Sequence, residues 1–230
     1  MKKYLLVSMA IFTITIACSQ TEKGKKIICA QFNVSGNDNS NVDNLYSIKT
    51  NSLGFQIVPG FGYFISDNIA VGVNLKVGIS NTKSVLINSD QIPDLITTNK
   101  SSAKNYGGGV FAKYYKKITT NLLFSLNGEA SFSYQTTKLE HSTNDPWYVA
   151  SPDNPAIQEV QLKSVFAGIS PGLVYFISPK LGISTNFSSF YFNNSSSKNI
   201  SVTFPNDNKV NSYGFNFSIT TLYLGLNYNF

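Results

Sequence analysis

The chain has one histidine, His141, which stands between Glu140 and Ser142. Hydroxyl, imidazole and carboxylate groups support nucleophilic catalysis when they lie within hydrogen-bond reach of one another. The surrounding segment is rich in Asn, Asp and Pro, so we predict a solvated loop with no serine fixed beside His141. We therefore predict no catalytic residues, and a lipid-modifying barrel enzyme is the least favoured function.

Metal and cofactor sites are also not predicted. Glu140, Asp145, Asp153 and Glu159 are carboxylates close in sequence, but their spacing matches no calcium-binding loop. If the N-terminal segment is removed, Cys29 is the one cysteine left, which excludes an intrachain disulfide and a cysteine-based metal site. We read Cys29 as a small residue on the first strand.

Three charged residues fall in the polar phase of alternating segments: Lys76, Lys113 and Glu129. If these segments form a narrow closed sheet, that phase faces the interior, where a charge needs a partner. Our hypothesis is that Lys76 and Glu129 pair across the lumen as a plug, with Gly107 and Gly109 leaving room between them. A separation of more than about 8 Å between their charged atoms would contradict this hypothesis.

The elements that must position these residues are β-strands. Apolar and polar residues alternate with period two, most clearly over Ile69 to Ser80, as half-buried strands require. Eight such segments are predicted: 28–35, 52–66, 69–80, 106–115, 122–134, 162–177, 181–192 and 213–230.

The connections between the segments alternate in length. Short turns are expected at 67–68, 116–120 and 179–180, and long polar loops at 36–46, 81–105, 136–158 and 193–211. An up-and-down transmembrane barrel has short periplasmic turns and long extracellular loops. We thus predict an all-β, eight-stranded antiparallel up-and-down transmembrane β-barrel with both chain ends in the periplasm.

An internal repeat supports this arrangement, because residues 57–66 resemble residues 169–178. Each copy contains Pro-Gly, at Pro59 and at Pro171. Proline cannot donate to a β-ladder, so we predict a bulge or local break at both positions.

The N-terminus has the pattern of an export signal. Lys2 and Lys3 precede an apolar stretch from Tyr4 to Ala17 that is too short to span a membrane as a helix. We predict a signal peptide over residues 1–19, cleaved near Ser19, and a barrel domain over residues 20–230. The alternative to cleavage near Ser19 is a lipoprotein signal in which Cys18 is lipidated.

Charge is scarce and narrows the function further. Charged residues make up 13% of the chain, which contains no arginine. A nucleic-acid role is therefore not predicted. We expect the lysines to lie near acidic lipid headgroups.

Aromatic residues cluster at the predicted strand ends. Tyr63, Tyr114, Tyr175 and Tyr228 lie near a short turn or the C-terminus, as in a periplasmic aromatic girdle. Candidates for the opposite girdle are Phe55, Tyr134, Phe187 and Tyr191. The soluble alternative is a β-core packed with aromatic residues.

The last strand alternates up to Tyr228 and Phe230, the final residue. Together with the signal segment, Gln-Thr-Glu-Lys-Gly (20–24) and Tyr-Phe-Ile-Ser-Asp-Asn (63–68), this strand resembles the outer-membrane β-barrel domain family of small porin-like proteins, of the OmpX and OmpA barrel type. The resemblance covers the whole mature chain. It implies that Phe230 and Tyr228 form a signal for the barrel-assembly machinery, a transient partner. In a departure from OmpA, we expect no peptidoglycan-binding periplasmic domain after the barrel.

The resemblance also sets the functional expectation. We expect an integral protein of the bacterial outer membrane with a structural or surface-interaction role, in contact with membrane lipids and lipopolysaccharide, non-enzymatic and monomeric. The alternative is a narrow porin-like conduit for small or apolar solutes.

Overall fold

The computed structural model describes residues 21–43, 46–89, 95–145, 156–186, 188–201, 207–217 and 224–230. Within them every regular element is a β-strand, and no helix is long and apolar enough to cross a membrane. The predicted signal peptide, its cleavage site and Cys18 lie outside the described residues. The strands are β1 (Lys26–Val42), β2 (Tyr46–Ser66), β3 (Ile69–Asn88), β4 (Leu95–Lys117), β5 (Leu122–Thr143), β6 (Ile157–Phe176), β7 (Leu181–Asn186), β8 (Ser188–Asn199), β9 (Asp207–Phe217) and β10 (Leu224–Asn229).

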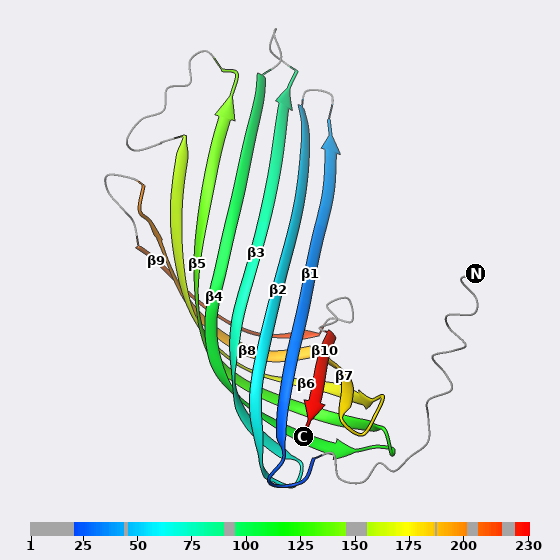
Figure 1. The fold of residues 1–230 in the computed structure, drawn as a ribbon. Coiled ribbons are helices and arrows are strands. Elements are labelled where there is room, and N and C mark those ends of the chain that lie inside the picture. The colour runs from blue at the N-terminus through cyan, green and yellow to red at the C-terminus, as the bar shows by residue number, and fades with distance from the viewer. Residues whose placement is uncertain are drawn as a thin grey trace, which may run out of the picture.

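All strand pairings are antiparallel, and neighbours in sequence pair from β1 to β7 (Figure 1). β10 then pairs with both β7 and β1, so the pairings return to the first strand near the short turns. β8 pairs with β6 and β9 farther from these turns. The predicted antiparallel up-and-down sheet is confirmed.

The described part of the chain shows ten strand segments, whereas eight were predicted. β7 and β8 both pair with β6 and are separated by position 187 alone, which is not described. β9 and β10 are likewise separated by residues 218–223, which lie outside the described residues.

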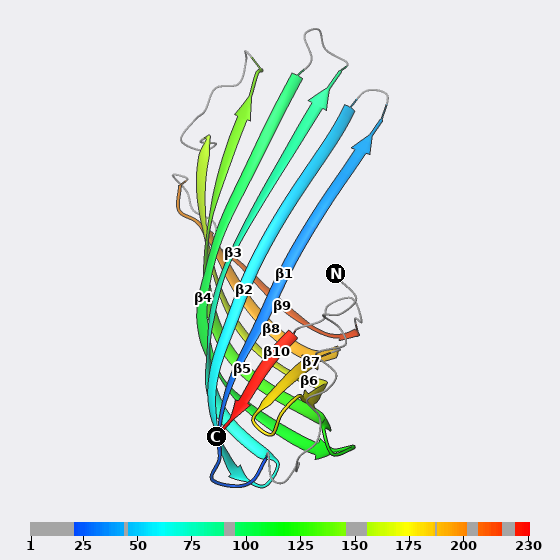
Figure 2. The ribbon, with the colours of Figure 1, turned by 45° about the vertical axis from the view of Figure 1, so that its right-hand side comes forward.

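The prediction of four long polar loops was wrong in extent. β3 continues to Asn88 and β4 begins at Leu95, so most of the expected loop 81–105 is a paired hairpin. β5 likewise continues to Thr143. The reason is that backbone pairing needs no apolar side chain, so the ladder continues after the apolar alternation stops. Figure 2 shows these long extensions on β1 to β5.

Each Pro-Gly position lies at a break in one of its two ladders, whereas the other ladder continues and pairs Pro59 with Ala30 and Pro171 with Leu126. The β2–β3 ladder pairs Ile57 with Val77 and Gly60 with Asn74, so it omits Pro59 without a change of register. On β6, pairing with β8 ends at Ile169, and pairing with β7 resumes at Gly172. Pro171 therefore lies where the seventh strand is divided.

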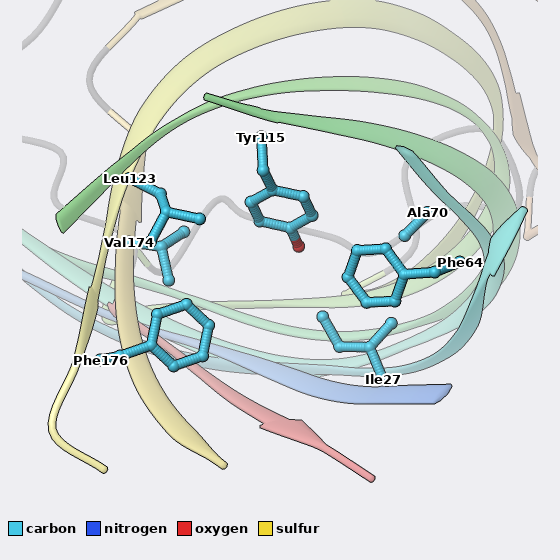
Figure 3. Packing of buried hydrophobic residues seen from close by; sticks show 7 residues of the cluster. All are labelled: Ile27, Phe64, Ala70, Tyr115, Leu123, Val174 and Phe176. Atoms are coloured by element: carbon cyan, nitrogen blue, oxygen red, sulfur yellow. The ribbon is translucent and has the colours of Figure 1, made fainter. Parts of the chain in front are cut away.

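A buried apolar cluster fills the interior near the short turns (Figure 3). Tyr115 and Phe64 meet at its centre with ring centroids 5.8 Å apart, and both are almost inaccessible to solvent. The other members come from β1, β3, β5 and β6: Ile27, Ala70, Leu123, Val174 and Phe176. Phe64 and Tyr115 are bulky, inward-facing residues at the ends of their strands, and together with these neighbours they form an apolar floor to the interior.

Glycines on the inner face make room for one large ring above this floor. A Cβ added at Gly62 would come 3.0 Å from Phe111 Cζ, and one at Gly72 would come 2.5 Å from the same atom and closer still to the Phe61 carbonyl oxygen. Phe111 is thus packed against bare backbone on β2 and β3.

Candidate functional site

The structure brings Lys76 and Glu129 together. Lys76 on β3 and Glu129 on β5 point inward across β4, and Lys76 Nζ lies 2.6 Å from Glu129 Oε1. Lys76 Nζ donates its hydrogen bond to Ser131 Oγ at 2.9 Å, and the approach to Glu129 is an ion-pair contact outside hydrogen-bond geometry. The side chains are 18% and 14% exposed, so the ion pair is largely shielded from solvent.

Gly107 and Gly109 leave the space that this crossing needs. A Cβ at Gly109 would lie 2.6 Å from Ser131 Cβ, and one at Gly107 would lie 3.0 Å from Ser133 Cβ. β4 and β5 approach each other so closely at these glycines that no larger residue fits there without a shift of the backbone.

Lys113, the third inward charge, is also buried but lies apart from the ion pair. It forms no ion pair with a described residue, and its Nζ lies 5.1 Å from the centroid of the Phe111 ring. Asn127, which pairs with Lys113 between β5 and β4, and Asn74 on β3 are buried, and their side-chain oxygens accept no hydrogen bond from the described residues. The interior near Lys113 therefore contains buried polar groups besides the Lys76–Glu129 pair.

Cys29 faces the interior as a free, buried thiol. It lies opposite Gly60, where an added Cβ would come 2.8 Å from its Sγ. This agrees with the prediction of a small residue on the first strand.

The prediction that His141 lies in a solvated loop was wrong, because His141 belongs to β5 and is half-buried. Its Nδ1 lies 2.7 Å from Asn99 Oδ1 on β4. The two residues line a hollow of about 320 Å³ on the inner face, together with Thr82, Ser84 and Gln158 among others. Lys100 and Glu140 also line this hollow, although they are in the opposite phase of their strands from Asn99 and His141.

On the outer face at this level, Lys138 donates a hydrogen bond to Glu140 Oε1 at 2.8 Å. This hydrogen bond and the charge of Lys138 hold the pKa of Glu140 below its usual value. Glu140 is therefore engaged with Lys138, and it and Ser142 are in the opposite phase of β5 from His141.

The predicted girdle residues Tyr63, Tyr114, Tyr175 and Tyr228 all lie on the outer face near the short turns, each between 43% and 48% exposed. Phe230 is also exposed, its ring centroid lies 6.0 Å from that of Tyr228, and its backbone exchanges two hydrogen bonds with Lys26 at the start of β1.

Farther from the short turns, where the opposite girdle was predicted, Tyr134 lies beside Tyr106, with ring centroids 5.2 Å apart. Phe55 is exposed there too. Tyr191 was wrongly placed in this girdle: it faces inward and stacks on Phe166 at 6.5 Å, because the outward phase of β8 belongs to Phe190 and Phe192. Phe187 lies outside the described residues.

Sequence reasoning missed the apolar floor. Its signal was available, since Phe64, Tyr115 and Phe176 all occupy the inward phase next to a short turn. Within the described residues, no group of three or more His, Cys, Asp or Glu side chains is placed to hold a metal ion.

Comparison with known proteins gives structural matches alone. No protein-family model and no curated protein matches the chain. Similar solved structures include the outer membrane protein OprG from Pseudomonas aeruginosa, with TM-score 0.43 and 16% identity over 92% of this chain and 98% of that one. A major outer membrane protein from Thermus thermophilus gives TM-score 0.36 and 11% identity, over 90% and 99% of the two chains.

The transport unit of the autotransporter AIDA-I from Escherichia coli gives TM-score 0.37 and 10% identity, over 99% of this chain and 82% of that one. The first two of these matches are outer membrane proteins by name. At such low identities and TM-scores they carry no inference about what this chain binds or does.

Proposed function

We propose that this chain is an eight-stranded β-barrel of the bacterial outer membrane with a structural or surface-interaction role, non-enzymatic and monomeric, and closed to solute flow by its own side chains. In this proposal β7 with β8, and β9 with β10, are the seventh and eighth strands. Residues 1–19 are its cleaved signal peptide, and both chain ends lie in the periplasm.

The observation that carries the proposal is the apolar band on the outer face. On β3 the outward residues are apolar from Ile69 to Ile79, and on β4 the band runs from Tyr106 to Tyr114. The outward positions change to Asn81 and Lys104 directly beyond it. A transmembrane β-strand needs about 9–11 residues, which is the width of this band. A water-soluble sheet would not expose so many large apolar side chains in one contiguous surface.

The inclination of the band also fits a membrane. One row of paired residues runs through Ile79, Lys104, Thr136, Gln161, Lys198 and Asp207. On β3 the uninterrupted apolar run of the outer face ends at Ile79. On β9 it ends at Tyr213, which lies six positions past Asp207 toward the short turns.

Between β3 and β9 the apolar edge shifts by six residues along the strand direction, at about 3.3 Å each, while the row crosses five strand spacings of about 4.8 Å. The apolar edge is therefore inclined by about 40° to the rows of paired residues. Strands of membrane barrels tilt by about 35–45°, so a flat membrane surface would produce this inclination.

The interior supports a passive role. The apolar floor lies at the short-turn end, and the Lys76–Glu129 pair crosses the space above it. Eight-stranded barrels are just wide enough for side chains to fill. The 320 Å³ hollow beside His141 favours the alternative, a narrow conduit for small solutes, because it gives such a solute a place to bind at the far end of the interior.

Fractionation with surface proteolysis tests the proposal. The full chain, expressed in a Gram-negative host, is expected in the outer membrane, with protease cleavage in the connections far from the termini. A soluble mature chain in the periplasm would refute it. Steady conductance in planar bilayers would replace the passive role with the conduit.

A further inference from the structure

Lysines gather on the outer face at one particular height, just beyond the apolar band. On each of six strands, the second or fourth residue past the end of the uninterrupted apolar run of the outer face is an exposed lysine. These residues, here called the lysine band, are Lys49 on β2, Lys83 on β3, Lys104 on β4, Lys138 on β5, Lys163 on β6 and Lys209 on β9.

The lysine band follows the inclined apolar edge. Lys104 and Lys163 stand two residues beyond Tyr106 and Val165, although these lysines belong to different rows of the sheet. On strands tilted by about 40°, four residues rise about 10 Å along the membrane normal, so the whole band fits within a headgroup layer.

The band is short of acidic partners. Among the described residues that lie two or four positions past the apolar run of their strand, Asp38 on β1 is the one carboxylate. Of the six lysines, Lys138 alone forms an ion pair with a described residue, Glu140. Lys83 stands directly opposite Lys100 in the β3–β4 ladder, and like charges in opposed positions destabilise a sheet. Lys100 lies opposite Glu140 in the next ladder, and this carboxylate is shared with Lys138.

We propose that the lysine band binds the phosphate groups of lipopolysaccharide in the outer leaflet. This inference rests on the proposed function, which places the band at the extracellular end because both chain ends lie at the opposite one. Lysine is a compact point charge that pairs readily with phosphate, and lysines on neighbouring strands can hold several phosphate groups at once. The bound headgroups neutralise the band and bridge adjacent strands.

The test uses the purified full chain in neutral detergent, titrated with diphosphoryl lipid A and with the same lipid after removal of its phosphates, and bound lipid is counted by native mass spectrometry. One variant carries Lys83→Gln, Lys104→Gln and Lys163→Gln. A control variant with the same charge change carries Lys116→Gln, Lys117→Gln and Lys180→Gln, exposed residues beside the short turns.

The wild-type chain and the control are expected to bind diphosphoryl lipid A equally, and the band variant about ten-fold more weakly or worse. Dephosphorylated lipid should bind all three chains weakly. Equal binding by the band variant, or binding that does not depend on phosphate, would overturn the inference. So would equally effective competition by inorganic polyphosphate, which would make the ligand a soluble phosphate. If no chain folds into detergent or vesicles, the proposed function itself fails.

Discussion

Replacing Lys76 with methionine would leave the carboxylate of Glu129 inside the barrel without its cation. At 2.6 Å and an effective dielectric constant of about 20, the attraction between the two charges is about 6 kcal/mol, much of which offsets the cost of removing them from water. Breaking a buried pair from one side costs about 3–5 kcal/mol. Because both side chains keep some exposure, we expect Lys76→Met to lower the free energy of unfolding by about 3 kcal/mol.

The double variant Lys76→Met/Glu129→Leu should recover most of this loss, since it removes both charges and keeps apolar volume. The coupling energy between the two sites is obtained from urea unfolding in detergent, followed by far-ultraviolet circular dichroism. The four proteins compared are the wild type, Lys76→Met, Glu129→Leu and the double variant. Lys104→Met, on the exposed outer face, serves as the control and should change stability by less than about 0.5 kcal/mol. Additive effects of the two single substitutions would refute the view that the pair acts as a unit.

Three further substitutions test the interior and the chain end. Tyr115→Phe removes a buried hydroxyl that has no hydrogen-bond partner, and should raise the free energy of unfolding by about 1 kcal/mol in urea titrations; a loss would reveal a partner for the hydroxyl. Gly72→Ala forces a Cβ against the Phe111 ring and should lower the free energy of unfolding by about 2 kcal/mol. Gly36→Ala is the control, because its Cβ meets nothing closer than 3.8 Å, and it should change the free energy of unfolding little in the same titrations. Phe230→Ser should reduce the amount of folded protein in the outer membrane of cells without slowing refolding in detergent, because its side chain is exposed; equal amounts in cells would contradict its role in assembly.

The strand ends near the short turns could be predicted from the sequence, and the opposite ends could not. Ile69 and Leu122 begin β3 and β5 as expected, because polar turn residues and apolar alternation meet there. Directly beyond Ile79 the outward residues are Asn81 and Lys83, on a strand that continues to Asn88. Period-two alternation reports the contrast between two faces, and this contrast disappears where both faces are polar.

The same limit explains how the candidate site was read. The pairing of Lys76 with Glu129 could be predicted because apolar and polar residues alternate clearly on their strands, which shows that both side chains face inward. A charge that faces the interior needs a partner. His141 lies where alternation has faded, so its position on β5 and its contact with Asn99 had no signal in the sequence. The inward phase of Phe64 and Phe176 next to short turns did indicate the apolar floor, but it does not say which distant strands bring these residues into one cluster.

The pairing between β1 and β10 has a consequence for the order of folding. It joins residues 27–32 to residues 224–229 through six paired positions, whereas β3 and β4 share twenty. Contacts between such distant parts of a chain form late, because the entropy of closing the loop is lost before they stabilise anything. We therefore expect this seam to be the last to form and the first to open. Its amide hydrogens should exchange with solvent faster than those of the β3–β4 hairpin.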